Sequence, residues 1–163
     1  MAKSKIIRQY KNKIMSELSQ DDDIIRGLGL NDDESEDDLI WVRLMPHHYV
    51  PNTQESVKTY ITVEIDIPQR RSRYGESGSS IWTHPYVIFR VVTHQEDMRL
   101  NIAGESGTRM DYLAELIEDK YEGRQDFGVG TLTLVSDVAG DINNTYRVRE
   151  LVFETVDVSG VCG

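Results

Sequence analysis

Glu64 and Asp66 are the two residues whose types and spacing come closest to a catalytic pair. They lie two positions apart in an alternating segment, and residues i and i+2 of a strand project from the same face. Two carboxylates on one face could bind a divalent metal ion, as in a small metal-dependent hydrolase, or act as general acid and general base. The same alternation is typical of a solvated sheet face, and no Lys or His nearby completes a hydrolase pattern. We therefore expect ordinary surface residues here.

The other residues that could do chemistry also lack the pattern for it. His47 and His48 are adjacent, so in an extended chain they point to opposite faces and do not chelate one metal ion. Cys162 is the single cysteine, which excludes an intramolecular disulfide and a cysteine-based zinc site. The glycine-rich stretches are not followed by the Lys and Ser or Thr of a phosphate-binding loop. We expect no enzyme activity, with no catalytic residue, no cofactor and no bound metal ion.

A loop from Pro68 to Ser80, followed by Trp82, carries residues that are typical of protein contacts. It is longer than the usual connection of about four to six residues, which is typical of functional or disordered loops. Arginine, tyrosine and tryptophan are common anchors of protein interfaces, although a solvated, flexible loop is the alternative. The residues that we expect at an inter-subunit or partner contact are Arg70, Arg71, Arg73, Tyr74 and Trp82.

The formal net charge of −10 is distributed unevenly along the 163 residues. Residues 1–20 carry a net charge of +4, residues 21–38 carry −8, and the rest of the chain carries −6. A negative surface disfavours binding to nucleic acid or to an anionic membrane, and no apolar run approaches the ~20 residues of a membrane span. Because the crowded acids after residue 20 repel one another, we expect a solvated linker there. The ligand spacing of a calcium-binding loop is absent.

Hydrophobic periodicity predicts an α+β fold with a mostly antiparallel sheet, flanked by an N-terminal amphipathic helix and a second, central helix. The length fits a single domain, which we divide into an amphipathic helix (1–20), an acidic linker (21–38), an α+β body (39–158) and a frayed tail (159–163). Alternation over 57–67 predicts a strand with one buried and one solvated face. The other expected elements are strands over 39–45, 86–93, 131–137 and 146–158, a helix that begins at Thr108, and a hairpin loop over 139–144.

The order of the expected elements is informative in itself. A helix over Thr108–Ile117 follows an alternating strand, Tyr60–Ile67, that runs into a proline-led loop, and the last strand ends with Val152–Val158. Together with the N-terminal helix and the strand near Leu39–Met45, these segments resemble the tail terminator, or tail completion, proteins of long-tailed bacteriophages. The resemblance covers most of the chain and rests on the order and character of the elements.

The resemblance implies a structural virion protein of the neck or tail. Its partners would be further copies of itself, the tail tube protein and the head–tail connector proteins, with no membrane involved. The family forms a hexameric ring that caps the tail tube, stops its growth and joins the tail to the head. The sheet and the helix from Thr108 would lie in the ring, and the loop from Pro68 to Ser80 would contact a neighbouring subunit or the tube.

DNA would pass through such a ring without specific binding, because acidic residues repel phosphates. The protein would be assembled in the host cytoplasm and found in the virion. A head-closure or connector-adaptor subunit of the neck has a similar character and is the first alternative. The alternative from another class is the small metal-dependent hydrolase that uses Glu64 and Asp66.

Overall fold

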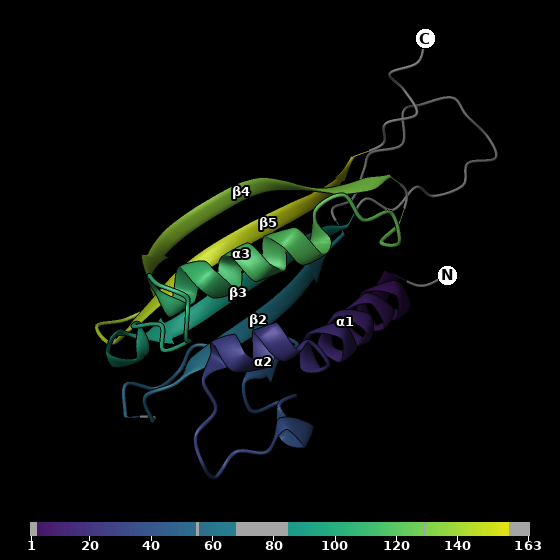
Figure 1. Ribbon diagram of the computed structural model, residues 1–163. Coiled ribbons are helices and arrows are strands. Elements are labelled where there is room, and N and C mark those ends of the chain that lie inside the picture. Colours follow the sequence, from purple (N-terminus) through teal and green to yellow (C-terminus); the bar gives the residue numbers. More distant parts are fainter. Residues whose placement is uncertain (1–2, 55, 68–84, 129, 157–163) are drawn as a thin grey trace, which may run out of the picture.

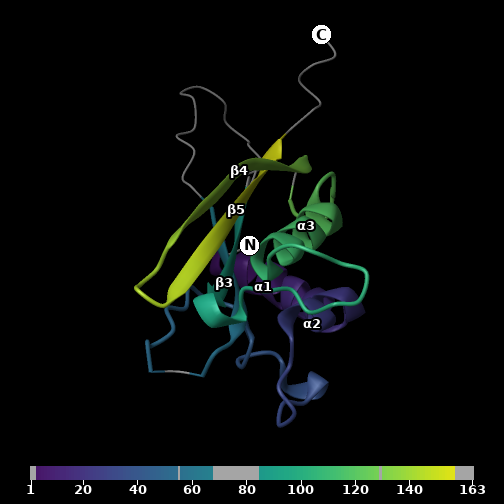
Figure 2. The ribbon, with the colours of Figure 1, turned by 60° about the vertical axis from the view of Figure 1, so that its left-hand side comes forward.

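The computed structural model describes residues 3–54, 56–67, 85–128 and 130–156. A five-stranded mixed sheet, with strand order β1-β2-β3-β5-β4, carries its α-helices on one face (Figures 1 and 2). This arrangement confirms the predicted α+β fold with an N-terminal helix and a central helix.

The helices form where the apolar periodicity predicts them. Thr108 caps the central helix, because its hydroxyl oxygen accepts a hydrogen bond from the backbone N–H of Asp111 at 3.1 Å. Gly123, at φ 81°, follows the end of the same helix. The bounds are α1 (Lys3–Ser19), α2 (Asp22–Leu28) and α3 (Arg109–Tyr121), with two short 3-10 helices, η1 (Glu36–Asp38) and η2 (Gln95–Asp97).

The strands build a sheet that is antiparallel except at one edge. β1 pairs with β2 in parallel, and the pairs β2–β3, β3–β5 and β4–β5 are antiparallel. The long strand β5 therefore lies inside the sheet, and β4 forms the edge opposite β1. The bounds are β1 (Leu44–Met45), β2 (Thr59–Asp66), β3 (Tyr86–His94), β4 (Thr131–Asp141) and β5 (Tyr146–Val156).

The main core lies between the helices and one sheet face. Leu18 of α1, Leu28 of α2 and Ile117 of α3 are fully buried against the strands. On the sheet side, the rings of Phe89 and Phe153 meet edge to face with centroids 5.7 Å apart. All three α-helices therefore contribute to one apolar core.

The predicted strand over 39–45 is wrong for most of its length. Only Leu44 and Met45 are in a strand, and the chain before them folds into a tight turn. The carbonyl oxygen of Leu39 accepts hydrogen bonds from the backbone N–H groups of Arg43 and Leu44, at 2.9 and 3.0 Å. Trp41 has a left-handed backbone, φ 73°, which a strand does not allow.

The solvated face predicted for the strand over 57–67 also needs correction. Tyr60 and Thr62, on the face away from the helices, are buried. The loop over 46–58 covers this end of that face, and the hydroxyl of Tyr146 donates a hydrogen bond to the carbonyl oxygen of Ser56 at 3.0 Å. A second, small cluster forms here from Met45, Tyr60, Val92 and Tyr146, with Tyr49, Ile142 and Val148 packed against it.

The β4–β5 hairpin is longer than predicted, since β4 continues through Ala139 to Asp141. Its loop is confined to 142–145, where the side-chain oxygen of Asn143 accepts from the N–H groups of Thr145 and Tyr146 at 2.9 and 2.8 Å. These side-chain bonds close the turn locally. The residues Ala139-Gly140-Asp141, which we expected in the loop, therefore remain paired with β5.

The acidic linker expected over 21–38 is in part folded. Asp21 caps α2 by accepting from the backbone N–H groups of Asp23 and Ile24, and Ile24 and Leu28 are fully buried. Negative side chains at a helix N-terminus are favourable. These acids therefore stabilise the helix, whereas we expected their mutual repulsion to leave the segment a solvated linker.

Candidate interaction surfaces

The residues predicted to contact a partner, Arg70, Arg71, Arg73, Tyr74 and Trp82, lie outside the described residues. The same is true of the proposed frayed tail over 159–163.

Glu64 and Asp66 share a face of β2, as the alternation predicts, but they do not form a paired site. The carboxylate of Glu64 accepts a hydrogen bond from the backbone N–H of His48 at 2.9 Å and lies 3.7 Å from the guanidinium of Arg90. Arg90 in turn pairs with Glu150 across the neighbouring strand at 2.7 Å. Among the described residues, no group of three or more His, Cys, Asp or Glu side chains is placed to hold a metal ion.

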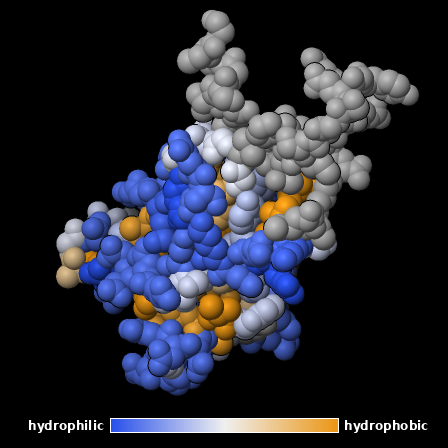
Figure 3. Space-filling model, turned by 90° about the vertical axis from the view of Figure 1, so that its right-hand side faces the viewer, coloured by the Kyte–Doolittle hydropathy of each residue, from blue (hydrophilic) through white to orange (hydrophobic). Residues whose placement is uncertain are grey.

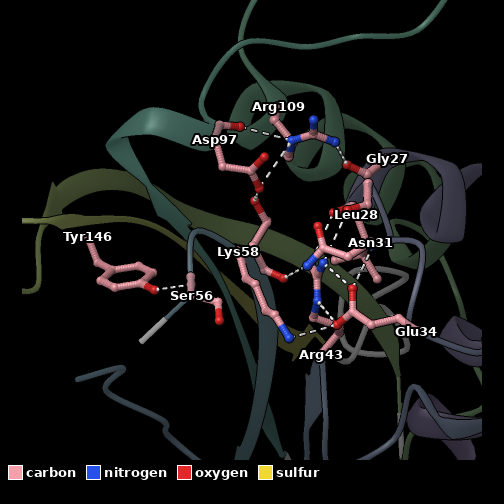
Figure 4. A network of polar contacts seen from close by, with 12 residues as sticks. Gly27, Leu28, Asn31, Glu34, Arg43, Ser56, Lys58, Asp97, Arg109 and Tyr146 are labelled. Atoms are coloured by element: carbon pink, nitrogen blue, oxygen red, sulfur yellow. Dashed lines mark hydrogen bonds and ion pairs between the residues drawn. The ribbon is translucent and has the colours of Figure 1, made fainter. Parts of the chain in front are cut away.

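A buried ion network is the most elaborate polar feature that the structure describes (Figure 4). Arg43 is fully buried, and its guanidinium donates to both carboxylate oxygens of Glu34, at 2.8 and 2.7 Å. Lys58 donates to the same carboxylate at 3.0 Å. Because of the hydrogen bonds from Arg43, the pKa of Glu34 is lowered from 4.5 to about 2.

Arg43 also satisfies backbone carbonyl groups at the end of α2. Its guanidinium donates to the carbonyl oxygens of Leu28 and Gly29, both at 3.1 Å, and to that of Thr59 in β2 at 2.8 Å. Carbonyl groups at a helix C-terminus have no partner within the helix, so a cation placed there is stabilising. The network therefore fixes α2, β2 and the turn before β1 to one another.

A second arginine makes the corresponding connection to α3. Arg109, in the first turn of α3, donates to the carbonyl oxygens of Gly27 at 2.7 Å and Asp97 at 2.9 Å. The carboxylate of Asp97 also accepts from the hydroxyl of Thr59 at 2.7 Å. Arg43 thus ties the end of α2 to β2, and Arg109 ties it to α3 (Figure 4).

The turn over 40–42 is exposed although its flanks are buried. Trp41 is 65% exposed and Ile40 and Val42 are also exposed, while Leu39 and Leu44 are almost completely buried. Two backbone hydrogen bonds hold the strained backbone of Trp41 in place: its own N–H donates to the carbonyl oxygen of Leu44 at 2.9 Å, and that of Val42 donates to the carbonyl oxygen of Leu39 at 3.2 Å. The sequence did not reveal this surface, because the apolar run Ile40-Trp41-Val42 is typical of the strand that we predicted over 39–45.

Acidic side chains lie beside one end of this turn, where Val42 lines a hollow with Asp33 and Asp38, while the ring of Trp41 lies 5.8 Å from that of His47. Six of the nine acids in residues 21–38 make no ion pair with any described residue, namely Asp22, Asp32, Asp33, Glu36, Asp37 and Asp38. We name residues 31–42, which join these acids to the apolar turn, the acidic lobe. Figure 3 shows one side of the molecule, where apolar patches interrupt a mostly hydrophilic surface.

The outer edge of β4 is the second exposed apolar surface. Val135 is 49% exposed and Val138 is 59% exposed. The register of β4 against β5 shifts between Leu134 and Ser136, so Val135 sits in a bulge. β4 is the last strand of the described sheet. At its start, the backbone N–H groups of Leu132 and Leu134 donate to the carbonyl oxygen of Arg124 at 2.7 Å and to the carboxylate of Glu122 at 2.6 Å, so the open part of the edge begins after Leu134.

The fold and these surfaces define a small α+β protein with two exposed apolar surfaces, the acidic lobe and the β4 edge. The profile of the YomW family matches residues 10–155, and the chain belongs to this family. The family is a phage-derived group of Bacillus prophage proteins, so the chain is a phage-associated protein. Comparisons with curated proteins and with solved structures gave no match. Within the described residues, none of the helices has the length and apolar character needed to cross a bilayer.

Proposed function

We propose that this chain is a structural subunit of the phage neck, a tail terminator that forms a ring, caps the tail tube and joins the tail to the head connector. Membership of a phage-derived family supports a role in the phage, and the described surfaces favour protein contacts. We assign it no enzymatic activity and no cofactor. Its partners are further copies of itself, the tail tube protein and the connector proteins, and its location is the neck of the virion.

The open edge of β4 is the observation that carries this proposal. An edge strand presents unpaired N–H and C=O groups, which proteins usually shield with lysine, proline, a bulge or a covering element. Residues 122–124 cover the start of the β4 edge, at Leu132 and Leu134. The part of the strand that follows the bulge contains neither Lys nor Pro and exposes Val138. Such an edge is suited to contact with another chain.

A ring requires that this edge meets a different surface of the next subunit. Two copies that join through the same surface form a closed dimer, whereas contact between unlike surfaces generates a ring. The other end of the sheet is β1, and at strand spacings of 4.8 Å it lies roughly 19 Å from β4. The chain therefore has room for unlike contacts on opposite sides.

The net charge of −10 agrees with a ring through which DNA passes without being bound. Like charges repel, so an acidic protein surface gives phosphates no specific attachment. This part of the proposal concerns the assembled particle rather than any single described residue.

Deletion of this chain from the phage or inducible prophage that encodes it tests the proposal. Electron microscopy of the resulting lysate should show tail tubes of uncontrolled length and heads without tails. Tails of normal length that do not join heads would instead indicate the head-closure or connector-adaptor alternative. Complete, joined particles would contradict any neck role.

A further inference from the structure

We propose that the acidic lobe docks a cationic, amphipathic segment of a second protein. The lobe lies at the β1 end of the sheet, on the side opposite the β4 edge. The proposed ring brings a neighbouring subunit to this β1 side, so a second copy is the competing occupant, and the experiment separates the two.

Trp41 provides the apolar anchor of this surface. It is 65% exposed, and Ile40 and Val42 are exposed on either side of it. Exposed tryptophan is among the residues that contribute most to protein binding. The turn is held rigidly, since the neighbouring Arg43 is fully buried and bonded to Glu34 and Thr59. A preorganised anchor loses little conformational entropy when a partner binds.

Two open hollows on the lobe and its base accept further apolar side chains. The larger, about 430 Å³, is lined by Ile25 and Leu30 together with Asp22, Arg26 and Glu36. The smaller, about 230 Å³, is lined by Leu39 and Val42 together with Asp33, Glu34, Ser35 and Asp38. Each hollow therefore has aliphatic residues with carboxylates around them. A segment with aliphatic and basic side chains could pack on the first and form ion pairs with the second.

Charge determines the kind of partner. Asp33, Glu36 and Asp38 line the hollows and make no ion pair with a described residue. A carboxylate that is not neutralised within the chain gains from contact with Lys or Arg of a partner. Nucleic acid is excluded because its phosphates carry the same sign of charge.

The α1 surface of a second copy is a poor occupant. Its exposed cations on α1 are Lys5 and Arg8, and the exposed residues beside them are polar, for example Gln9 and Asn12. Such a face supplies charge but nothing apolar to meet Trp41. A separate protein with alternating basic and aliphatic residues fits both properties of the lobe.

The test uses the full chain and a labelled helical peptide built from leucine and lysine as the probe, with binding followed by fluorescence anisotropy. Two variants address the lobe, Trp41→Ser and the triple variant Asp33→Asn, Glu36→Gln, Asp38→Asn. A matched control, Glu115→Gln, Glu118→Gln, Asp119→Asn, removes the same charge from exposed positions of α3. Circular dichroism verifies that each variant is folded.

We expect both lobe variants to weaken binding about tenfold or more, and the α3 control to leave it nearly unchanged. A peptide of alanine and lysine with the same charge should bind much more weakly than the leucine peptide. The proposal would be overturned if the lobe and α3 variants lost the same amount of peptide affinity, or if the two peptides bound equally well. Either result would mean that the peptide is attracted only by the net negative charge of the protein. Loss of self-association in Trp41→Ser without any peptide binding would also overturn it, because the occupant would then be a second copy.

Discussion

Arg43 and Glu34 form a two-point ion pair, with nitrogen–oxygen distances of 2.8 and 2.7 Å, between the buried residue that follows the exposed turn and a segment that contains nine acids. The carboxylate of Glu34 is only 8% exposed, and Lys58 and the backbone N–H of Asn31 complete its hydrogen bonds. One acid of the charged run is therefore part of the folded interior. The pair connects the acidic lobe to the sheet.

Glu34→Gln should destabilise the fold by about 3 kcal/mol, because it leaves the buried guanidinium of Arg43 without its counter-charge. Urea unfolding of the variant and the wild type measures the difference. Glu36→Gln, at an exposed position of the same segment, is the control and should change the free energy of unfolding by less than about 0.5 kcal/mol. Equal small effects at both positions would contradict a structural role for the pair.

The contribution of Glu34 should disappear in acid. Its pKa is lowered from 4.5 to about 2 by the hydrogen bonds from Arg43, so the folded state holds the charged form more strongly than the unfolded state does. The stability advantage of the wild type over Glu34→Gln is therefore complete above pH 4.5 and lost as the pH falls from 4.5 towards 2. Urea titrations across this range measure it. An advantage that is independent of pH would show that charge is not its cause.

Trp41→Gly should be more stable than Trp41→Ala by about 1 kcal/mol, because φ 73° is accessible to glycine and unfavourable for alanine. Thermal unfolding of the two variants measures the difference. Comparing the variants with each other removes the effect of losing the indole ring, which both share. A more stable alanine variant would show that the turn does not have this backbone in solution.

Gly27→Ala should destabilise the protein by about 1–3 kcal/mol, although alanine is the better helix former. An added Cβ at this position of α2 would lie 2.6 Å from the side chain of Leu113 and 3.1 Å from that of Tyr112 in α3. Gly140→Ala is the matched control, since the nearest atom to its Cβ would be 3.8 Å away on Val148. Chemical denaturation should show a loss for Gly27→Ala alone; a gain would mean that α2 and α3 are less closely packed.

The sequence predicts elements well where one local pattern decides the structure. α3 has a helical period, a capping threonine at 108 and a glycine at 123, and β2 has strict alternation. The turn at Trp41 could not be predicted, because no glycine or asparagine marks its left-handed residue. The role of Glu34 could not be predicted either, because only the tertiary fold brings its partners Arg43 and Lys58 close to it.

The prediction of a solvated face for β2 was wrong for a related reason. Alternation indicates which residues share a face, but a loop from elsewhere in the chain decides whether that face meets water. Here Tyr49 of the loop over 46–58 packs against Tyr60, with ring centroids 5.1 Å apart. The contact residues predicted between Arg70 and Trp82 lie outside the described residues and stay predictions.

The mass of the purified, full-length chain tests the central claim most directly. Native mass spectrometry should give a ring whose mass is a multiple, expected to be sixfold, of 18.7 kDa. Val138→Lys places a charge on the β4 edge and should give monomers, while Val50→Lys, at an exposed position of the 46–58 loop, should keep the ring. A wild-type chain that stays monomeric at every concentration, or a ring that tolerates Val138→Lys, would contradict the account.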